Sequence, residues 1–341
     1  MVEPEGVSVV LPVLNEHDNL EPLHARLVEV LKCLGRDYEI IYVDDGSSDG
    51  SWDVLRALAA GDSSVRLVRL RKNFGQTPAL SAGFAHSRYP ILVTLDADLQ
   101  NPPEEIAHLL AEMDAGHDYV GGVRLKREDV WWRRIASRAM NRLRERITHI
   151  KMTDQGCMLR AYSRDIVDAV TAAREVSTYI PALAYTFAHS PTEVEVAHEE
   201  RVAGESKYSL YKLIRLNFDL ITGFSLVPLQ LFSLFGMFVA AMSLVLYAVV
   251  FVQRTLAGDF RGGLTALWDR DILVFFLIGV MLFGVGLVGE YVGRIYQQVR
   301  DRPRFTIRAV LERPSGENGD QVPNVLNEKA RGGHEELRSV R

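Results

Sequence analysis

One stretch of the sequence argues against a fully soluble fold, because no side chain between residues 220 and 253 is charged. The most apolar part of this stretch, Leu229 to Val252, would span about 36 Å as a helix at 1.5 Å per residue. The hydrocarbon core of a bilayer is about 30 Å thick, so a helix of this length can cross it with some tilt. We therefore predict a transmembrane helix at residues 225–253.

A second uncharged stretch, Ile272 to Gly289, follows soon afterwards and continues through Tyr291 with one acidic residue, Glu290. A buried helix of a soluble domain is an alternative interpretation of a stretch this short. The neighbouring longer span favours a second transmembrane helix at residues 272–293. Residues 254–271 would then connect the two helices of a hairpin.

Basic residues near the two predicted spans indicate the orientation of the hairpin. Positively charged flanks stay in the cytoplasm, whereas the connecting loop balances three arginines against three aspartates. We therefore predict a periplasmic loop and cytoplasmic chain ends. Residues 205–224 mix apolar and basic side chains and predict an amphipathic helix in the membrane interface, or a linker helix. The flanking basic residues are Lys207, Lys212, Arg215, Arg294, Arg300, Arg302, Arg304 and Arg308.

Upstream of these segments, strand-like and helix-like patterns alternate. Runs rich in Val, Ile and Leu are separated by helical patterns, and the first helical pattern has apolar residues at Leu20, Leu23 and Leu27. This alternation predicts an α/β domain at residues 1–204, with a parallel sheet covered by helices. The four runs are residues 7–13, 39–43, 65–70 and 91–95.

Each of the four runs ends in a cluster of polar residues. Ligands of parallel sheets bind outside the carboxyl ends of the strands, and that is where all four clusters fall. The sequence therefore predicts one binding site built from four loops. The clusters are Asn15–Glu16, Asp44–Asp49, Arg71–Gln76 and Asp96–Gln100.

The last cluster contains two carboxylates at i and i+2, Asp96 and Asp98. In an extended backbone this spacing points both side chains the same way. Hard oxygen ligands suit Mg²⁺ or Mn²⁺ bound together with a diphosphate. A solvated turn gives the same pair, so the prediction of a metal-dependent nucleotide-sugar site depends on the neighbouring clusters.

Several classes of protein are disfavoured by composition. The net charge of -5 argues against nucleic acid as a partner. The two cysteines, Cys33 and Cys157, are far apart and offer neither a disulfide framework nor a zinc site. The chain leads directly into a predicted strand, so no secretory signal is expected. We also expect His17, His86 and His198 to be surface or packing residues.

Three motifs resemble those of glycosyltransferase family 2 enzymes of GT-A fold that act on polyprenyl phosphates. They are DADLQNPPEEI from Asp96, DQGCMLRAY from Asp154 and GESKYS from Gly204. The resemblance runs from about Val7 to Phe305, and it is strongest to the branch that transfers 4-deoxy-4-formamido-L-arabinose to undecaprenyl phosphate. It implies a Rossmann-like domain, a UDP-sugar donor, Mg²⁺ or Mn²⁺, a place in the bacterial inner membrane and a homotetramer. In that branch the product serves lipid A modification and resistance to cationic antimicrobial peptides.

The resemblance also implies a set of residues around the donor. Pro12, Leu14, Glu16 and Asp45 resemble the positions that hold the base and ribose, with Asp44 beside them. Arg201 and Lys207 resemble a cationic pair for the diphosphate. The remaining residues of the predicted nucleotide-sugar site are Asn73, Gln76 and Ala97.

Three carboxylates are implied in catalysis. Asp96 resembles the residue that orients the donor sugar or the metal, while Asp98 and Gln100 resemble the metal ligands. Asp154 matches the residue usually discussed as the base. A phosphate monoester is mostly dianionic at pH 7, so Asp154 either acts as a base or positions the acceptor. The lipid phosphate would be held by Arg124, Arg133 and Ser137.

The predicted function is thus a single inverting transfer from a UDP-sugar to undecaprenyl phosphate. UDP-glucose is the alternative donor, and a processive glycan synthase or a non-catalytic nucleotide-binding membrane protein are the alternatives from other classes.

Residues 294–311 are predicted to return to the cytoplasm. Residues 312–341 hold many charges and few large apolar groups, which predicts a disordered tail.

Overall fold

The computed structural model describes residues 6–124, 150–154, 156–173, 179–199, 265–299 and 303–312, with parts of 227–245. The chain divides into two compact units. One unit contains the α/β domain and the segment from residue 302 onward, and the other contains the apolar helices.

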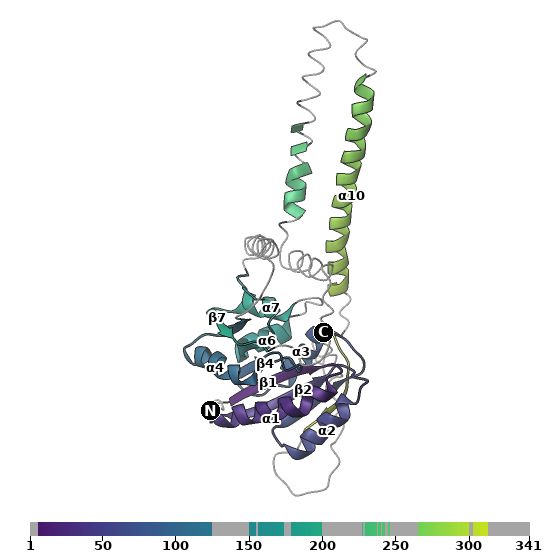
Figure 1. Ribbon diagram of the computed structural model, residues 1–341. Helices are drawn as coiled ribbons and strands as arrows, with labels where there is room; N and C mark the ends of the chain where they lie inside the picture. Colours follow the sequence, from purple (N-terminus) through teal and green to yellow (C-terminus); the bar gives the residue numbers. More distant parts are fainter. Residues whose placement is uncertain are drawn as a thin grey trace, which may run out of the picture. The chain divides into compact units, whose positions relative to one another are not determined.

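The α/β unit is built on a sheet of eight described strands in the order β7-β5-β6-β4-β1-β2-β3-β8. Four of these strands, β1, β2, β4 and β7, are labelled in Figure 1. β6 and β8 are antiparallel to their neighbours, so the prediction of a parallel sheet is wrong for these two strands. When β6 begins, the chain is at the edge where β5 ended, and it must therefore run back in the opposite direction. The strands are β1 (Gly6–Val13), β2 (Asp37–Asp44), β3 (Val65–Leu70), β4 (Ile91–Thr94), β5 (Tyr119–Arg124), β6 (Arg160–Ser163), β7 (Pro191–Val196) and β8 (Ile307–Leu311).

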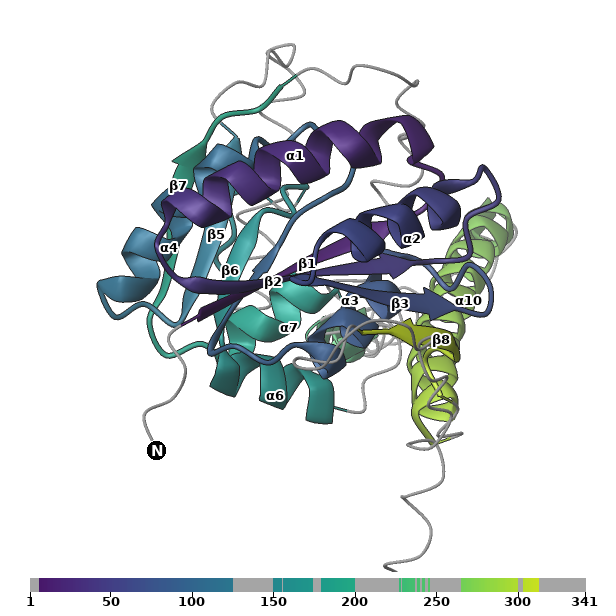
Figure 2. The same ribbon diagram turned by 90° about the horizontal axis from the view of Figure 1, so that it is seen from below.

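Helices cover both faces of this sheet, as Figure 2 shows. One face carries α1 (His17–Cys33), α2 (Ser51–Gly61) and α4 (Ile106–Asp114), which follows the short helix η1 (Pro103–Glu105). The other face carries α3 (Gln76–His86), α6 (Arg164–Ala172) and α7 (Ile180–Phe187). The predicted apolar stripe of α1 is buried against the sheet, since Leu20, Leu23, Leu27 and Leu31 are at most 1% exposed. Burial of this stripe supplies the main driving force for the helix to dock.

The strand order reverses at β1, which lies between β2 and β4. In sheets of this kind the crevice outside the carboxyl ends of the strands at such a switch point is the place where ligands bind. The polar clusters that follow β1, β2, β3 and β4 lie at this edge. The fold therefore places all four predicted loops where the site was expected.

The last described segment of the chain returns to the sheet. β8 pairs antiparallel with β3, and the backbone N–H of Arg71 donates to the carbonyl of Thr306 at 2.9 Å. The predicted domain boundary at residue 204 therefore leaves out one strand of the sheet. Sequence pattern alone did not reveal this, because the pairing is between segments more than 200 residues apart.

The second unit contains α10 (Thr265–Val299), a helix of 35 residues. Its stretch Leu277–Tyr296 has a mean hydropathy of 1.5, and it is the one helix among the described residues that is long and apolar enough to cross a membrane. The predicted span 272–293 lies within α10, which begins inside the range expected for the connecting loop. The described residues between 227 and 245 are helical, and the ring of Phe232 lies 6.0 Å from that of Phe283. The amphipathic helix, most of the first span and the tail after residue 312 lie outside the described residues.

Candidate functional site

The loop after β4 carries Asp96 and Asp98. The strand ends at Thr94, and residues 97–98 form a turn followed by Leu99 in the left-handed region at φ 61°. The prediction that the two carboxylates share one side of an extended strand is therefore wrong. The turn is closed locally, because the backbone N–H of Gln100 donates to Oδ1 of Asp98 at 3.2 Å.

The carboxyl of Asp96 has a shifted pKa, to which neighbouring charged groups contribute. Burial raises the pKa of its carboxyl to about 7, and the nearby charges of Asp98 and Glu16 add to the increase. Arg124 and the side-chain amide of Gln76 act in the opposite direction, and Nε2 of Gln76 donates to Oδ1 of Asp96 at 2.7 Å. The structure thus brings together side chains from three of the four predicted loops, those after β1, β3 and β4, with Arg124 at the end of β5.

This donor set fits a divalent cation. The pKa of Asp96 is raised in part by neighbouring carboxylates, and a cation would neutralise the negative charge that gathers there. Among the described residues there is no group of three or more His, Cys, Asp or Glu side chains arranged as a complete metal cage. Mg²⁺ is commonly held by one or two carboxylates together with water and substrate phosphates, so a cage is not required. Asp96, Asp98 and Gln100 are the residues that would hold it.

Asp45 joins the loop after β2 to the loop after β3. Its Oδ1 accepts the backbone N–H of Phe74 at 2.7 Å, and its Oδ2 accepts that of Gly75 at 2.8 Å. The carboxylate is buried, and burial raises its pKa despite these two bonds. Asp45 therefore fixes the segment that carries Asn73 and Gln76, both of which have exposed side chains.

Its neighbour Asp44 is fully buried and has both oxygens engaged. Oδ1 accepts the backbone N–H of Ser47 at 2.9 Å, and Oδ2 accepts Nε of Arg69 at 3.1 Å. These contacts hold the loop from within the sheet. Asp44 is thus placed as a structural residue, and its predicted contact with the nucleotide does not fit this burial.

Gly46 lies where the loop after β2 passes close to the loop after β3. A Cβ on Gly46 would lie 2.6 Å from the carbonyl carbon of Lys72, so the neighbouring loop occupies this space. The residue is also in the left-handed region, with φ at 76°. Glycine is needed here because two loops cross at close range.

Most of the remaining predicted donor residues lie at the end of β1 and in the loop that follows it. Pro12 is half-buried, Leu14 is 39% exposed, and the carboxylate of Glu16 accepts Nδ2 of Asn19 at 2.6 Å. Ala97, between the two aspartates, is buried. The loop is fixed to its neighbour by Asn15, whose Oδ1 accepts the backbone N–H of Ser48 at 2.9 Å.

Asp154 and Arg124 form a two-point ion pair at the same edge of the sheet. Nε of Arg124 donates to Oδ2 of Asp154 at 2.6 Å, and Nη2 donates to Oδ1 at 2.8 Å. The backbone N–H of Gly156 also donates to Oδ1, at 2.9 Å. Both side chains are largely buried, and this pair raises the pKa of Arg124. The predicted catalytic carboxylate and the predicted phosphate ligand are therefore direct partners.

Four predicted site residues lie outside the described residues. They are Arg133, Ser137, Arg201 and Lys207.

His198, predicted to be a surface or packing residue, has a partly exposed side chain close to Arg124, Asp98 and Asp154. Burial lowers the pKa of its imidazole and Arg124 lowers it further, while Asp98, Asp154 and a hydrogen bond with the Gln100 backbone act against this. The next residue, Glu199, donates its backbone N–H to the Gln100 carbonyl at 2.9 Å. A signal was present, because His198 follows an alternating run that lies within β7 (Pro191–Val196), just as the other clusters follow their strands.

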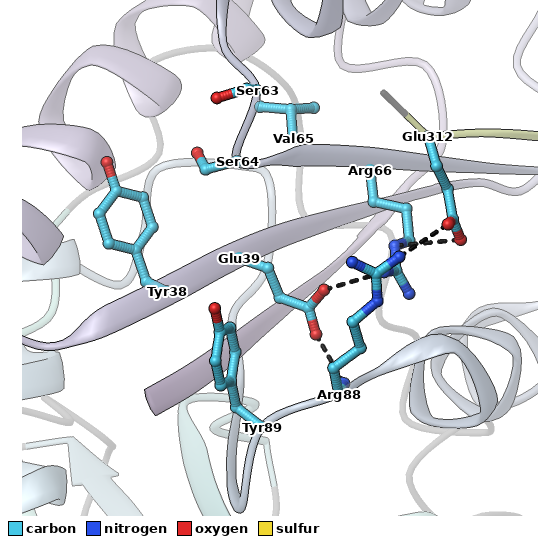
Figure 3. A pocket seen from close by; sticks show the side chains of 9 residues that line it. All are labelled: Tyr38, Glu39, Ser63, Ser64, Val65, Arg66, Arg88, Tyr89 and Glu312. Atoms are coloured by element: carbon cyan, nitrogen blue, oxygen red, sulfur yellow. Dashed lines mark hydrogen bonds and ion pairs between the residues drawn. The ribbon is translucent and has the colours of Figure 1, made fainter. Parts of the chain in front are cut away.

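A polar pocket lies at the opposite, amino end of the strands (Figure 3). Glu312 at the end of β8 contacts two guanidinium groups there, those of Arg66 at 3.2 Å and Arg88 at 2.7 Å. Buried Glu39 accepts the hydroxyl of Ser8 at 2.7 Å. The two contacts of Glu312 fasten β8 to the sheet at the end opposite the candidate site.

Comparison with known proteins identifies the family. The model of the family described as "Glycosyl transferase family 2" matches residues 8–171. Undecaprenyl-phosphate 4-deoxy-4-formamido-L-arabinose transferase of Enterobacter sp. (strain 638) is 46% identical over 91% of this chain and 94% of its own. The chain belongs to glycosyltransferase family 2. A transferase of the same name from Serratia proteamaculans (strain 568) is 47% identical over 92% of this chain and 97% of its own.

The family resemblance and the enzyme class predicted from the motifs are thus confirmed, and the protein is a glycosyltransferase with a GT-A, Rossmann-like α/β domain. Among solved structures, glucosyl-3-phosphoglycerate synthase from Mycobacterium tuberculosis, in complex with Mn²⁺, UDP and phosphoglyceric acid, is 18% identical with a TM-score of 0.44. That match covers 64% of this chain and 76% of the synthase.

Proposed function

We propose that this family 2 glycosyltransferase transfers a sugar from a UDP-sugar to undecaprenyl phosphate, and that the donor is UDP-4-deoxy-4-formamido-L-arabinose. The observation that carries this proposal is the 46–47% identity to transferases of that name, over more than nine tenths of each chain. The similarity extends beyond the catalytic domain into the apolar segments. A processive synthase and a non-catalytic binding protein are both disfavoured by it.

The donor would lie in the crevice between the loops after β1 and β4. Pro12, Leu14 and Glu16 would contact the nucleoside from one side, and Asn73 and Gln76 from the other. Asp45 supports this surface through the backbone of Phe74 and Gly75. Arg201 and Lys207 are proposed to contact the diphosphate.

The cofactor is proposed to be Mg²⁺ or Mn²⁺, held by Asp96, Asp98 and Gln100. When bound, such an ion neutralises the charge that develops on the departing diphosphate. The hydrogen bond from Gln76 keeps Asp96 oriented within the loop. We assign to Asp96 the orientation of the donor.

The reaction is proposed to be a single inverting displacement. An oxygen of the acceptor phosphate forms a bond to the anomeric carbon while the bond from that carbon to UDP breaks. At neutral pH a phosphate monoester is mostly dianionic, so it needs no base to become a nucleophile. We therefore assign Asp154 the role of positioning the acceptor through Arg124. A guanidinium has five N–H donors and the pair with Asp154 uses two of them, so Arg124 can also bind a phosphate, together with Arg133 and Ser137.

The membrane part of the proposal is a two-helix hairpin in the bacterial inner membrane, with a cytoplasmic catalytic domain. It is supported by the apolar helix α10 and by the contact of Phe232 with Phe283. Because a lipid acceptor lies in the membrane, an anchor that holds the catalytic domain at the membrane surface brings it within reach of the acceptor. The homotetramer implied by the family resemblance remains part of this proposal.

Incubating the purified full-length protein with Mg²⁺ or Mn²⁺, undecaprenyl phosphate and separate UDP-sugars tests the proposal. We expect a glycolipid of the mass of the formamido-arabinose product, and no product after addition of a chelator. A matched control uses the Asp98→Asn variant. Turnover with UDP-glucose and none with the formamido donor would refute the proposed donor, and absence of transfer to undecaprenyl phosphate from any donor would refute the acceptor.

A further inference from the structure

Arg160 is the largest completely buried side chain in the described part of the molecule. It opens β6, and all three of its nitrogens donate to neutral oxygens. Nε donates to the Cys157 carbonyl at 2.9 Å, Nη1 to the hydroxyl of Tyr119 at 2.5 Å, and Nη2 to the Asp154 carbonyl at 2.6 Å. No carboxylate within the described ranges forms an ion pair with it. A buried charge without a counterion is costly, so its retention calls for a specific role.

The neighbouring strand is shaped around this guanidinium. A Cβ on Gly121 would lie 2.9 Å from Nη1 of Arg160, and a Cβ on Gly122 would lie 2.8 Å from the carbonyl oxygen of Leu159. Two consecutive glycines weaken the interior of a strand, because they have no side chain to pack. Here they provide the space that the guanidinium and the chain leading into β6 occupy.

The two carbonyls that Arg160 binds belong to the loop that carries Asp154. One is the carbonyl of Asp154 itself, and the other is that of Cys157, three residues later. A planar guanidinium offers its donors in a fixed fork, so it holds both carbonyls in one relative position. The side chain of Asp154 is held separately by Arg124 and the N–H of Gly156.

We propose that Arg160 is a positioning residue for sugar transfer: it fixes the backbone at Asp154 and Cys157, so that the Asp154–Arg124 pair meets the acceptor phosphate in one orientation. Arg160 is too deeply buried to contact a substrate, so it acts only through this loop. The inference rests on the proposed function, because it assigns the pair to the acceptor.

The test is the substitution Arg160→Lys. A lysine ammonium keeps the charge but lacks the planar fork that holds both carbonyls. Because small misplacements of a reacting group can reduce rates by about 100-fold, we expect a fall in kcat of that order with the KM for the UDP-sugar unchanged. Measuring the rate over a range of UDP-sugar concentrations up to saturation separates kcat from the KM for the UDP-sugar.

Two matched variants separate positioning from general loss of stability. Arg66→Lys is the same substitution at another buried arginine, which is ion-paired with Glu39 and Glu312 at the amino end of the sheet (Figure 3). Tyr119→Phe removes one bond of Arg160 but leaves both bonds to the loop. We expect both variants to melt at a lower temperature and to keep kcat within about threefold of the wild type.

A double-mutant cycle with Asp154→Asn decides whether Arg160 acts through Asp154. If it does, the double variant is no slower than Asp154→Asn alone, because residues that act as a unit are not additive. Multiplied losses would overturn the inference. Should Arg160→Lys fail to fold, Gly121→Ala replaces it in the same cycle. This variant keeps the arginine, but its Cβ would lie 2.9 Å from Nη1 and displace the guanidinium slightly.

Hydrogen exchange of the 154–158 segment provides a readout that needs no substrate. We expect faster exchange in Arg160→Lys than in wild type or Arg66→Lys, and equal exchange would overturn the inference. A wild-type protein that transfers no sugar would count against the proposed function. The exchange measurement would still show whether Arg160 orders the loop.

Discussion

Replacing Asp45 by asparagine tests how the donor-site loops are held together. The carboxylate accepts two backbone N–H groups, from Phe74 and Gly75. An asparagine has one acceptor oxygen and one amino group, so it keeps one bond and points a donor at the other N–H. A hydrogen bond to a charged acceptor contributes about 1.5–3 kcal/mol, and the buried N–H left unpaired costs about 1–3 kcal/mol more.

Part of this loss is offset, because burial of the carboxylate raises its pKa and its removal relieves a desolvation cost. We therefore expect a net loss of about 2 kcal/mol in the free energy of unfolding. For a domain of about 200 residues this lowers the melting temperature by about 4–8 °C. UDP affinity should fall as well, since the released segment carries Asn73 and Gln76.

Thermal unfolding of the full-length protein in detergent, followed by calorimetric titration with UDP, measures both effects. The control is Asp53→Asn, which makes the same change at an exposed residue of α2 whose contact with Arg56 is 3.9 Å long. That variant should melt within about 1 °C of the wild type. The reasoning is refuted if Asp45→Asn melts as the wild type does, or if both variants lose stability equally.

Three further predictions concern other parts of the α/β unit. Gly46→Ala should lower the free energy of unfolding by about 2 kcal/mol or more, because its Cβ would clash with the Lys72 backbone. Gly35 is the control, because it has a similar φ and a Cβ there would meet no atom within 4 Å. Chemical denaturation should show a loss of about 1 kcal/mol or less for Gly35→Ala. Asp98→Asn should weaken Mn²⁺ binding, observed by electron paramagnetic resonance, and reduce turnover about 100-fold or more; unchanged binding would remove Asp98 from the metal site. Burial lowers the pKa of His24 below its usual 6.5, so stability should decrease as the pH falls through 6.5, where the unfolded chain takes up the proton first. His24→Gln should show a shallower dependence of melting temperature on pH between 7 and 5, and an identical slope would contradict this assignment.

The local pattern of the sequence was sufficient to predict the site loops. Strand runs that end in polar clusters place Glu16, Gln76 and Asp96 at one edge of a sheet, and the structure brings these three together around the Asp96 carboxylate. The rule is physical, because parallel strands end at the same edge. It needs only local hydrophobic periodicity.

The same pattern could not predict what depends on pairing between distant segments. The reversed direction of β6, the return of β8 to β3 and the burial of Asp44 against Arg69 are all set by tertiary contacts. The turn at Asp98 was missed because the i, i+2 rule assumes an extended backbone, and Leu99 leaves that conformation. His198 was not assigned to the site because β7 alternates valine with threonine and glutamate, so it was not among the apolar runs that located the loops.

The pairing of β8 with β3 makes the catalytic unit discontinuous along the gene product. A fragment truncated before the apolar helices would expose the N–H and C=O groups of β3 to other molecules, which is a known route to aggregation. It would also lose the contact that Thr306 makes with the loop at Arg71. Anyone wishing to crystallise the catalytic half alone should splice residues 303–312 back onto it through a designed linker.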